Sequence, residues 1–101
     1  MMKLYHDREL IGLIRNPGPD NLSWMMGTIE LSPTAKKYKE FFAFFADEDR
    51  LGNEKPPFPP ELLKDWNIEV ENGKRQPIAI PDVYENGEIF WRWLRLGNIS
   101  N

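Results

Sequence analysis

Residues 85–96 have the sequence Glu-Asn-Gly-Glu-Ile-Phe-Trp-Arg-Trp-Leu-Arg-Leu, which joins a turn signal to a dense apolar and aromatic run. Asparagine and glycine both tolerate positive φ, so Asn86-Gly87 predicts a two-residue type I′ turn. The residues on either side of this turn should then pair as antiparallel strands. We expect the residues after the turn to form the best-buried strand of a sheet.

The chain has 101 residues, which predicts one domain covering residues 1–101. Hydrophobic residues make up 41% of the sequence and charged residues 29%, values typical of a globular protein. The formal net charge of -3 argues against a dedicated binder of nucleic-acid phosphates. We therefore expect no nucleic-acid partner.

The sequence contains no cysteine, which excludes disulfides, thiolate metal sites and cysteine nucleophiles. Nothing in it requires an oxidising compartment, so we expect a cytoplasmic location. The N-terminal residues lack the apolar core of a signal peptide, and the longest apolar run, residues 41–46, is far too short to span a bilayer. We expect no membrane association.

Three strands are predicted before a helix. Residues 3–6 and 10–14 are rich in large apolar side chains and flank a charged triplet, which predicts a hairpin. Residues 16–21 contain two prolines among turn formers and predict an exposed loop. Residues 24–31 alternate apolar and polar side chains as a half-buried strand does, with Gly27 marking a bulge or a close contact.

The predicted helix begins at Ser32-Pro33, with the serine as N-cap and the proline at the first helical position. We expect it to run to about Arg50, because aromatic residues at i, i+3, i+4 and i+7 form one apolar stripe. These residues are Tyr38, Phe41, Phe42 and Phe45. Phe44 is expected at the edge of the stripe, partly exposed. The triplet 47–49 is acidic and would lie unfavourably at the negative end of the helix dipole.

Residues 53–60 contain four prolines and predict an extended connector with Phe58 turned inward, followed by a short helix over residues 61–65. A strand over residues 66–71 leads to Asn72-Gly73, a second type I′ signal. Residues 78–80 resume the strand, and residues 83–85 lead into the turn at Asn86-Gly87. Another hairpin is therefore expected in this region.

These elements predict an α+β domain with an antiparallel sheet of about five or six short strands and one main helix packed on one face. The expected order is β-β-β-α-β-β-β. The predicted core comprises the large apolar residues that these patterns turn inward. They are Leu4, Ile11, Leu13, Trp24, Ile29, Leu31, Tyr38, Phe41, Phe42, Phe45, Trp66, Ile68, Val70, Ile89, Trp91 and Trp93.

His6 is the one histidine of the sequence and lies next to Asp7. Neighbouring residues on a strand point to opposite faces, so we favour a partly exposed strand residue over a general base. The acidic residues 47–49 and 54 lack the alternating ligands and central glycine of a calcium loop. We find no phosphate-binding loop or catalytic motif, and we predict no catalytic residue, metal or cofactor.

Trp91-Arg92-Trp93 is the most suggestive local group, because on a strand the two indoles share a face and the arginine opposes them. An arginine between indoles can stack or bind an anion. The interpretation we favour is core packing of the aromatic residues, which leaves Arg92 or Arg95 to pair with a carboxylate.

The chain also resembles a known family. It has Gly12 in an early strand, Gly27-x-Ile29-x-Leu31-x-Pro33 leading into an aromatic helix, and Gly87-Glu88-x-x-Trp91-Arg92 near the end. This order resembles a family of short uncharacterised bacterial proteins with no assigned activity. The resemblance implies a single α+β domain and carries over no functional residue.

We expect a protein-binding or self-associating module without catalytic activity, because thirteen aromatic residues are too many for so small a core and exposed aromatics supply interface hot spots. A symmetric homodimer is the simplest form. The alternatives are a small anion-binding domain built on Arg92 and a carboxylate-dependent hydrolase. Candidate contact residues are Trp24, Met25, Met26, Phe44, Phe90, Arg92 and Leu94.

Overall fold

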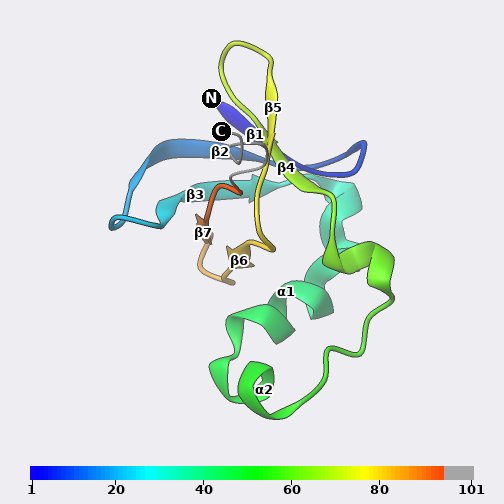
Figure 1. Cartoon of the computed structure of the whole chain (residues 1–101). Helices are drawn as coiled ribbons and strands as arrows, with labels where there is room; N and C mark the ends of the chain where they lie inside the picture. Colours follow the sequence, from blue (N-terminus) through cyan, green and yellow to red (C-terminus); the bar gives the residue numbers. More distant parts are fainter. Residues whose placement is uncertain (95–101) are drawn as a thin grey trace, which may run out of the picture.

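The strands form one antiparallel sheet in the order β5-β4-β1-β2-β3-β7-β6 (Figure 1). The computed structural model describes residues 1–94, so the predictions for Arg95 and Leu96 lie outside the described residues. The strands are β1 (Met2–His6), β2 (Glu9–Pro19), β3 (Met25–Leu31), β4 (Trp66–Glu69), β5 (Arg75–Pro77), β6 (Asp82–Val83) and β7 (Glu88–Trp91). The α+β class is confirmed. The sheet, however, has seven strands over these residues rather than five or six, and four strands instead of three follow the helices.

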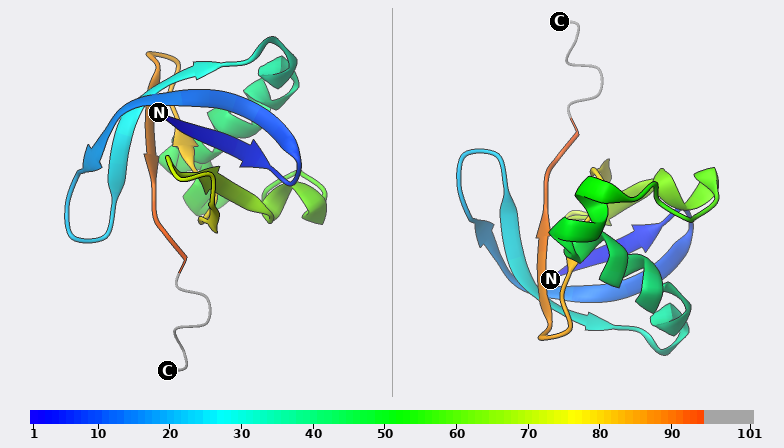
Figure 2. Two further views of the ribbon diagram at one scale, coloured as in Figure 1. Left: turned by 90° about the horizontal axis from the view of Figure 1, so that it is seen from above. Right: turned by 90° about the horizontal axis from the view of Figure 1, so that it is seen from below.

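The predicted N-terminal hairpin is present, but β2 continues to Pro19, so the loop predicted at residues 16–21 is wrong over its first four residues. The pairing of β2 with β3 shifts register between Arg15 and Gly18, and Asn16 has φ 53° there. This irregularity accommodates a proline that cannot donate to a ladder. The β2–β3 hairpin projects beyond the rest of the sheet (Figure 2).

Both Asn-Gly turns differ from the predicted type I′ geometry. Gly87 and Gly73 have positive φ, but the asparagine before each does not. In the β6–β7 hairpin the Gly87 N–H donates to the Tyr84 carbonyl at 3.0 Å, which places Glu85 and Asn86 at the centre of the turn. A turn of this kind followed by a glycine with positive φ is the geometry of a three-residue hairpin loop with a glycine bulge. Asn86 does not adopt positive φ, and its side chain stabilises the turn because Oδ1 accepts a hydrogen bond from the Glu88 N–H at 3.0 Å.

Residues 77–79 connect the two halves of the sheet. The Ile78 N–H donates to the Trp66 carbonyl of β4 at 3.0 Å. The Ala79 N–H donates to the Arg92 carbonyl at 3.0 Å, and the Leu94 N–H donates to the Pro77 carbonyl at 3.1 Å. This short segment is therefore hydrogen-bonded to β4 on one side and to the residues after β7 on the other. It curls the sheet around the core.

The single helix predicted from Pro33 to Arg50 is three pieces: η1 (Pro33–Tyr38), α1 (Lys39–Ala46) and α2 (Glu48–Asn53). The break falls at Asp47, whose backbone is extended and whose carboxylate accepts from the Asp49 and Arg50 N–H groups. The acidic triplet therefore begins a new helix, where negative charge is favourable, instead of ending the first one. Pro33 is at the helix start as predicted, but Ser32 does not cap it and donates to the Leu10 carbonyl at 3.1 Å.

The proline-rich connector ends in η2 (Pro60–Leu63), so the predicted short helix is present but covers these four residues instead of residues 61–65. Phe58 is turned inward as predicted and its ring lies 5.0 Å from that of Phe41. The helices lie on one side of the sheet (Figure 1). None of the helices in the described part of the chain is long and apolar enough to cross a membrane.

Ten of the sixteen predicted core residues are buried. Leu13, Trp24, Phe45, Val70 and Trp93 are half-buried. Leu31 is 42% exposed because β7 pairs with β3 only as far as Thr28. The core also contains residues that the sequence patterns missed, namely Ile14, Ala35, Ile78 and Val83.

The exchange of Leu13 for Ile14 in the core has a specific cause. In the pairing of β1 with β2, Leu4 lies opposite Gly12 and Tyr5 lies opposite Leu10, so Ile11 is an extra residue in β2. Such a bulge moves the alternation of inward and outward side chains by one position. Ile11 and Ile14 are both fully buried as a result.

Gly12 allows β2 and β3 to approach closely, and we predict that Gly12→Ala destabilises the fold. An added Cβ would lie 2.7 Å from the Glu30 carbonyl oxygen and 3.0 Å from Ile29 Cγ1. Overpacking of this kind costs about 1–3 kcal/mol in unfolding free energy. Gly18→Ala on the same strand is the matched control, because nothing lies within 4 Å of its added Cβ. Equal urea midpoints for the two variants would contradict the prediction.

Candidate functional site

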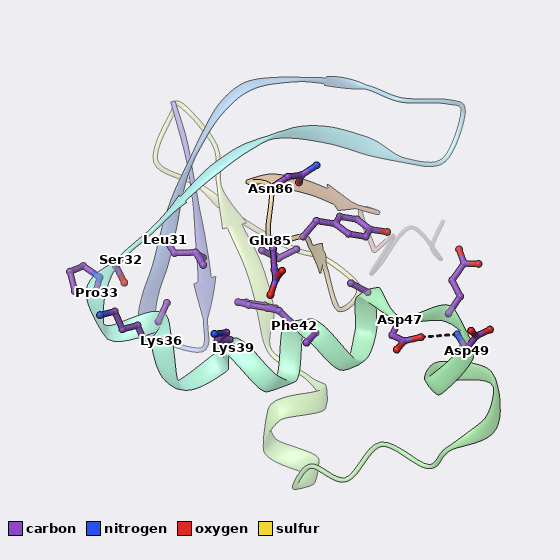
Figure 3. A pocket seen from close by; sticks show the side chains of 16 residues that line it. Leu31, Ser32, Pro33, Lys36, Lys39, Phe42, Asp47, Asp49, Glu85 and Asn86 are labelled. Carbon is purple, nitrogen blue, oxygen red and sulfur yellow. Dashed lines mark hydrogen bonds between the residues drawn. The ribbon is translucent and has the colours of Figure 1, made fainter.

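A groove of about 1310 Å³ lies between the helical segments η1 and α1 and the turn that joins β6 to β7 (Figure 3). One wall is the side of η1 and α1 that faces the β6–β7 turn, and the other is residues 83–86. The end of β3, at Leu31, closes the groove near the start of η1. The groove is larger than a second hollow, of about 320 Å³, which lies beside η1, α1 and Phe58.

The floor of the groove is apolar. Ala35, Phe42 and Val83 line it and are themselves buried, with at most 5% of each residue exposed. Leu31 and Ala43 line it as well and are exposed to solvent. Alanine at these helical positions leaves open space beside Phe42 that a larger side chain would fill.

Two lysines and two aspartates of the groove lie at opposite ends of it. Figure 3 shows Lys36 and Lys39 at the end near Pro33, with Asp47 and Asp49 at the opposite end. The eight residues of α1 lie between these ends, a rise of about 12 Å. Glu85 points from the β6–β7 turn toward α1 between the two ends (Figure 3).

The lysines at the groove differ from their neighbour on η1. Lys37 is paired with Glu9, with 3.0 Å between Nζ and Oε2. Among the ion pairs of residues 1–94, none contains Lys36 or Lys39. Their charges are therefore not neutralised by a close carboxylate in this part of the chain.

Negative charge accumulates at the other end. Burial raises the pKa of Asp82, the carboxylate of Glu48 raises it further, and Arg92 opposes the change. Burial also raises the pKa of Tyr84, with contributions from Asp82 and Glu48. Glu48 and Tyr84 line the groove, and Asp82 belongs to β6. The negative charge at the acidic end of the groove therefore extends into the sheet.

Four of the predicted contact residues lie together on the outer face of β3 and β7. Met26 is directly opposite Phe90, and the guanidinium of Arg92 lies 5.1 Å from the ring centroid of Trp24. Tyr84 contacts Phe90 edge to face, with 5.8 Å between ring centroids. We call Trp24, Met26, Tyr84, Phe90 and Arg92 the aromatic face. Because Tyr84 also lines the groove, the two surfaces are continuous.

The other three predicted contact residues are not part of the aromatic face. Met25 faces the other side of the sheet, opposite Trp91, and packs against the core. Phe44 is fully buried, so its predicted partial exposure is wrong. The connector places Phe58 5.7 Å from the Phe44 ring, and the guanidinium of Arg50 lies 4.8 Å from the same ring. Leu94, at the end of the described residues, is exposed.

His6 belongs to a hydrogen-bonded network outside the groove. Its Nδ1 lies 3.0 Å from the Tyr38 hydroxyl, and its Nε2 lies 2.9 Å from the Glu61 carbonyl oxygen. Tyr38 in turn donates to Glu9 at 3.0 Å. His6 is half-buried, as expected of a strand residue, and the network joins β1 and β2 to η1 and η2.

Comparison with known proteins identifies no relative: no family model, no curated protein and no solved structure matches the chain. The resemblance carried by Gly12, Gly27 and Gly87 therefore stays a prediction.

Sequence reasoning missed the groove. Its helical wall has a pattern that could have been noticed, because Lys39, Phe42, Ala43 and Ala46 follow the i, i+3, i+4, i+7 spacing of a second face of the helix. The opposite wall has no such signal, since residues 85–86 appear in the sequence only as a turn. The groove exists because the chain returns to α1 after about forty residues.

We predict that Tyr38 makes the fold sensitive to alkali. Burial and the hydrogen bond to Glu9 raise the pKa of Tyr38 from 10.0 to about 12. The unfolded chain thus loses this proton at a lower pH than the folded chain, so the free energy of unfolding should fall as pH rises from about 10 to about 12. Urea unfolding at a series of pH values measures this fall.

Tyr38→Phe should remove most of that fall and leave a smaller one from Tyr84, whose pKa is also raised. Tyr84→Phe is the matched variant and should retain the larger part. If Tyr38→Phe follows the wild-type pH profile above pH 10, the assignment to Tyr38 is wrong.

Proposed function

We propose that the protein is a small cytoplasmic protein-binding module without catalytic activity, and that the groove and the adjoining aromatic face are its docking surface. The observation that supports this most directly is the groove itself, which has an apolar floor and charges of opposite sign at its two ends. Such a surface complements a segment of a protein chain. Interfaces combine an apolar centre with a polar rim in the same way.

The dimensions of the groove favour a peptide over a small molecule. Pockets for drug-sized molecules usually enclose about 300–1,000 Å³ and direct a few polar groups at one ligand. This groove is larger, at about 1310 Å³, and its two lysines lie at the opposite end from Asp47 and Asp49 instead of converging on one ligand. The aromatic face adds a tryptophan and an arginine, residue types that are enriched among interface hot spots.

The two alternative functions have weaker support. For an anion site, Arg92 lies over Trp24, but Asp82 is close enough to Arg92 for the arginine to lower the Asp82 pKa, so its charge is partly neutralised. For a carboxylate-dependent hydrolase, Asp82 has the raised pKa that a general acid needs. Glu48, the carboxylate that raises the Asp82 pKa, is exposed. Hydrolysis by carboxylates would be better supported by two facing carboxylates that are both buried.

We predict that Ala43→Arg blocks binding in the groove. Ala43 is an exposed residue of the groove, so a long charged side chain there occupies the space without disturbing the core. Peptides selected from a random display library against the immobilised wild-type protein should bind Ala43→Arg at least about tenfold more weakly, which is about 1.4 kcal/mol. Fluorescence anisotropy with labelled peptides measures the change.

Gln76→Arg is the matched control for this test. It adds the same side chain and charge at an exposed position of β5, outside the groove, and should bind the peptides as the wild type does. A selection that yields no peptide, or only peptides that bind both variants equally, would refute the groove as a docking surface.

Self-association through the aromatic face is the second form of the proposal, and light scattering over a wide concentration range tests it. A dimer built on this face should dissociate in Phe90→Glu, because the substitution places a charge at the centre of the apolar contact. The control is Gln76→Glu, an exposed position of β5 at the other end of the sheet order. A wild-type protein that stays monomeric at high concentration would exclude the homodimer and leave the groove proposal in place.

A further inference from the structure

We infer that the groove recognises a segment of a partner protein that has an acidic side chain at one end, apolar side chains in the centre and a basic side chain at the other end. This inference rests on the proposed function and specifies its partner. The argument comes from the order in which cations, apolar residues and carboxylates follow one another along the groove.

The cationic end selects the acidic side chain. Lys36 and Lys39 are three positions apart, so they lie on one side of the helical segment, and both line the groove. Lys37, which does not line the groove, is the lysine of η1 that already has a carboxylate partner. The two lysines at the groove have no such partner within residues 1–94, and an incoming carboxylate would supply one.

The acidic end selects the basic side chain. Glu48 and Asp49 line the groove there, while Glu85 points toward α1 between the two ends. The Asp47 carboxylate is already engaged, because it accepts the Asp49 and Arg50 N–H groups. Glu48 is also close enough to Asp82 to raise the Asp82 pKa. A lysine or arginine from the partner would relieve this repulsion between carboxylates.

The centre selects apolar side chains. Ala43 is exposed between the two ends, Phe42 and Val83 form the floor beneath it, and Leu31 is 42% exposed at the end near η1. Covering Ala43 and Leu31 would remove their exposed apolar surface from water, which favours an apolar side chain of the partner. No charged residue of α1 interrupts the groove between Lys39 and Ala46.

The separation of the two charged ends sets a length for the segment. The ends are about 12 Å apart along α1, which corresponds to about four residues of extended chain or eight residues of helix. The acidic and basic residues of the partner should therefore be separated by that number of positions, with apolar residues between them.

Charge reversal tests the inference. Lys36→Glu/Lys39→Glu should weaken binding of the selected peptides at least about tenfold, and Glu48→Lys/Asp49→Lys should do the same. Replacing the acidic residue of a peptide with lysine should restore binding to the first variant but not to the second. Fluorescence anisotropy with the same labelled peptides measures all three effects.

Each reversal has a matched control with the same change in net charge. Lys55→Glu/Lys64→Glu matches the first variant and Asp20→Lys/Glu61→Lys matches the second, since all four residues are exposed and lie outside the groove. Both controls should bind as the wild type does. Equal losses in a variant and its control would show a general effect of net charge and overturn the inference.

The test separates this inference from the proposed function. Peptides that are blocked by Ala43→Arg but have no common charge pattern, and are unaffected by both reversals, would overturn the inference and leave the groove as a docking surface. Peptides that are unaffected by Ala43→Arg would overturn the proposed function as well.

Discussion

The packing of the indole of Trp66 joins the helices to the sheet. Trp66 is the first residue of β4, and its ring lies 5.5 Å from that of Phe41, nearly parallel to it, and 5.8 Å from that of Phe42. His6 of β1 lies on it with 4.6 Å between ring centroids. The indole N–H donates to the Leu62 carbonyl at 2.9 Å, so the buried polar atom is satisfied and η2 is held in place. One side chain thereby fixes α1, β1 and η2 relative to each other.

The position of α1 determines what the helix leaves exposed. Its aromatic side, with Phe41 and Phe42, is used by the core, so the lysine and alanine side is turned toward the β6–β7 turn. Asp47 then ends α1 and begins α2 by accepting two backbone N–H groups. The separation of charges along the groove is a consequence of this break, because it places the acidic triplet at the start of a second helix.

The hairpin of β6 and β7 links the groove with the aromatic face. Val83 points into the core while its neighbours Asp82 and Tyr84 lie on the outer side, as alternation along a strand requires. Tyr84 contacts Phe90 on one side and lines the groove on the other. A partner that extends from the groove onto the sheet would therefore meet a continuous surface.

Local sequence patterns determined the α+β class, the N-terminal hairpin, β3, the aromatic side of the helix and the positions, but not the type, of both glycine turns, because periodicity and turn chemistry depend on neighbouring residues. Tertiary structure determined the features that depend on contacts between residues far apart in the chain. The bulge at Ile11 depends on the pairing of β2 with β1, and it moved Ile14 into the core in place of Leu13. The burial of Phe44 depends on Phe58, which comes from the proline-rich connector. Of the candidate site, the sequence identified Trp24, Met26, Phe90 and Arg92, which share a face because β3 pairs with β7 in one register. The groove could not be predicted from the sequence, because the two walls of the groove are some forty residues apart in the chain and meet only when α1 packs beside β6.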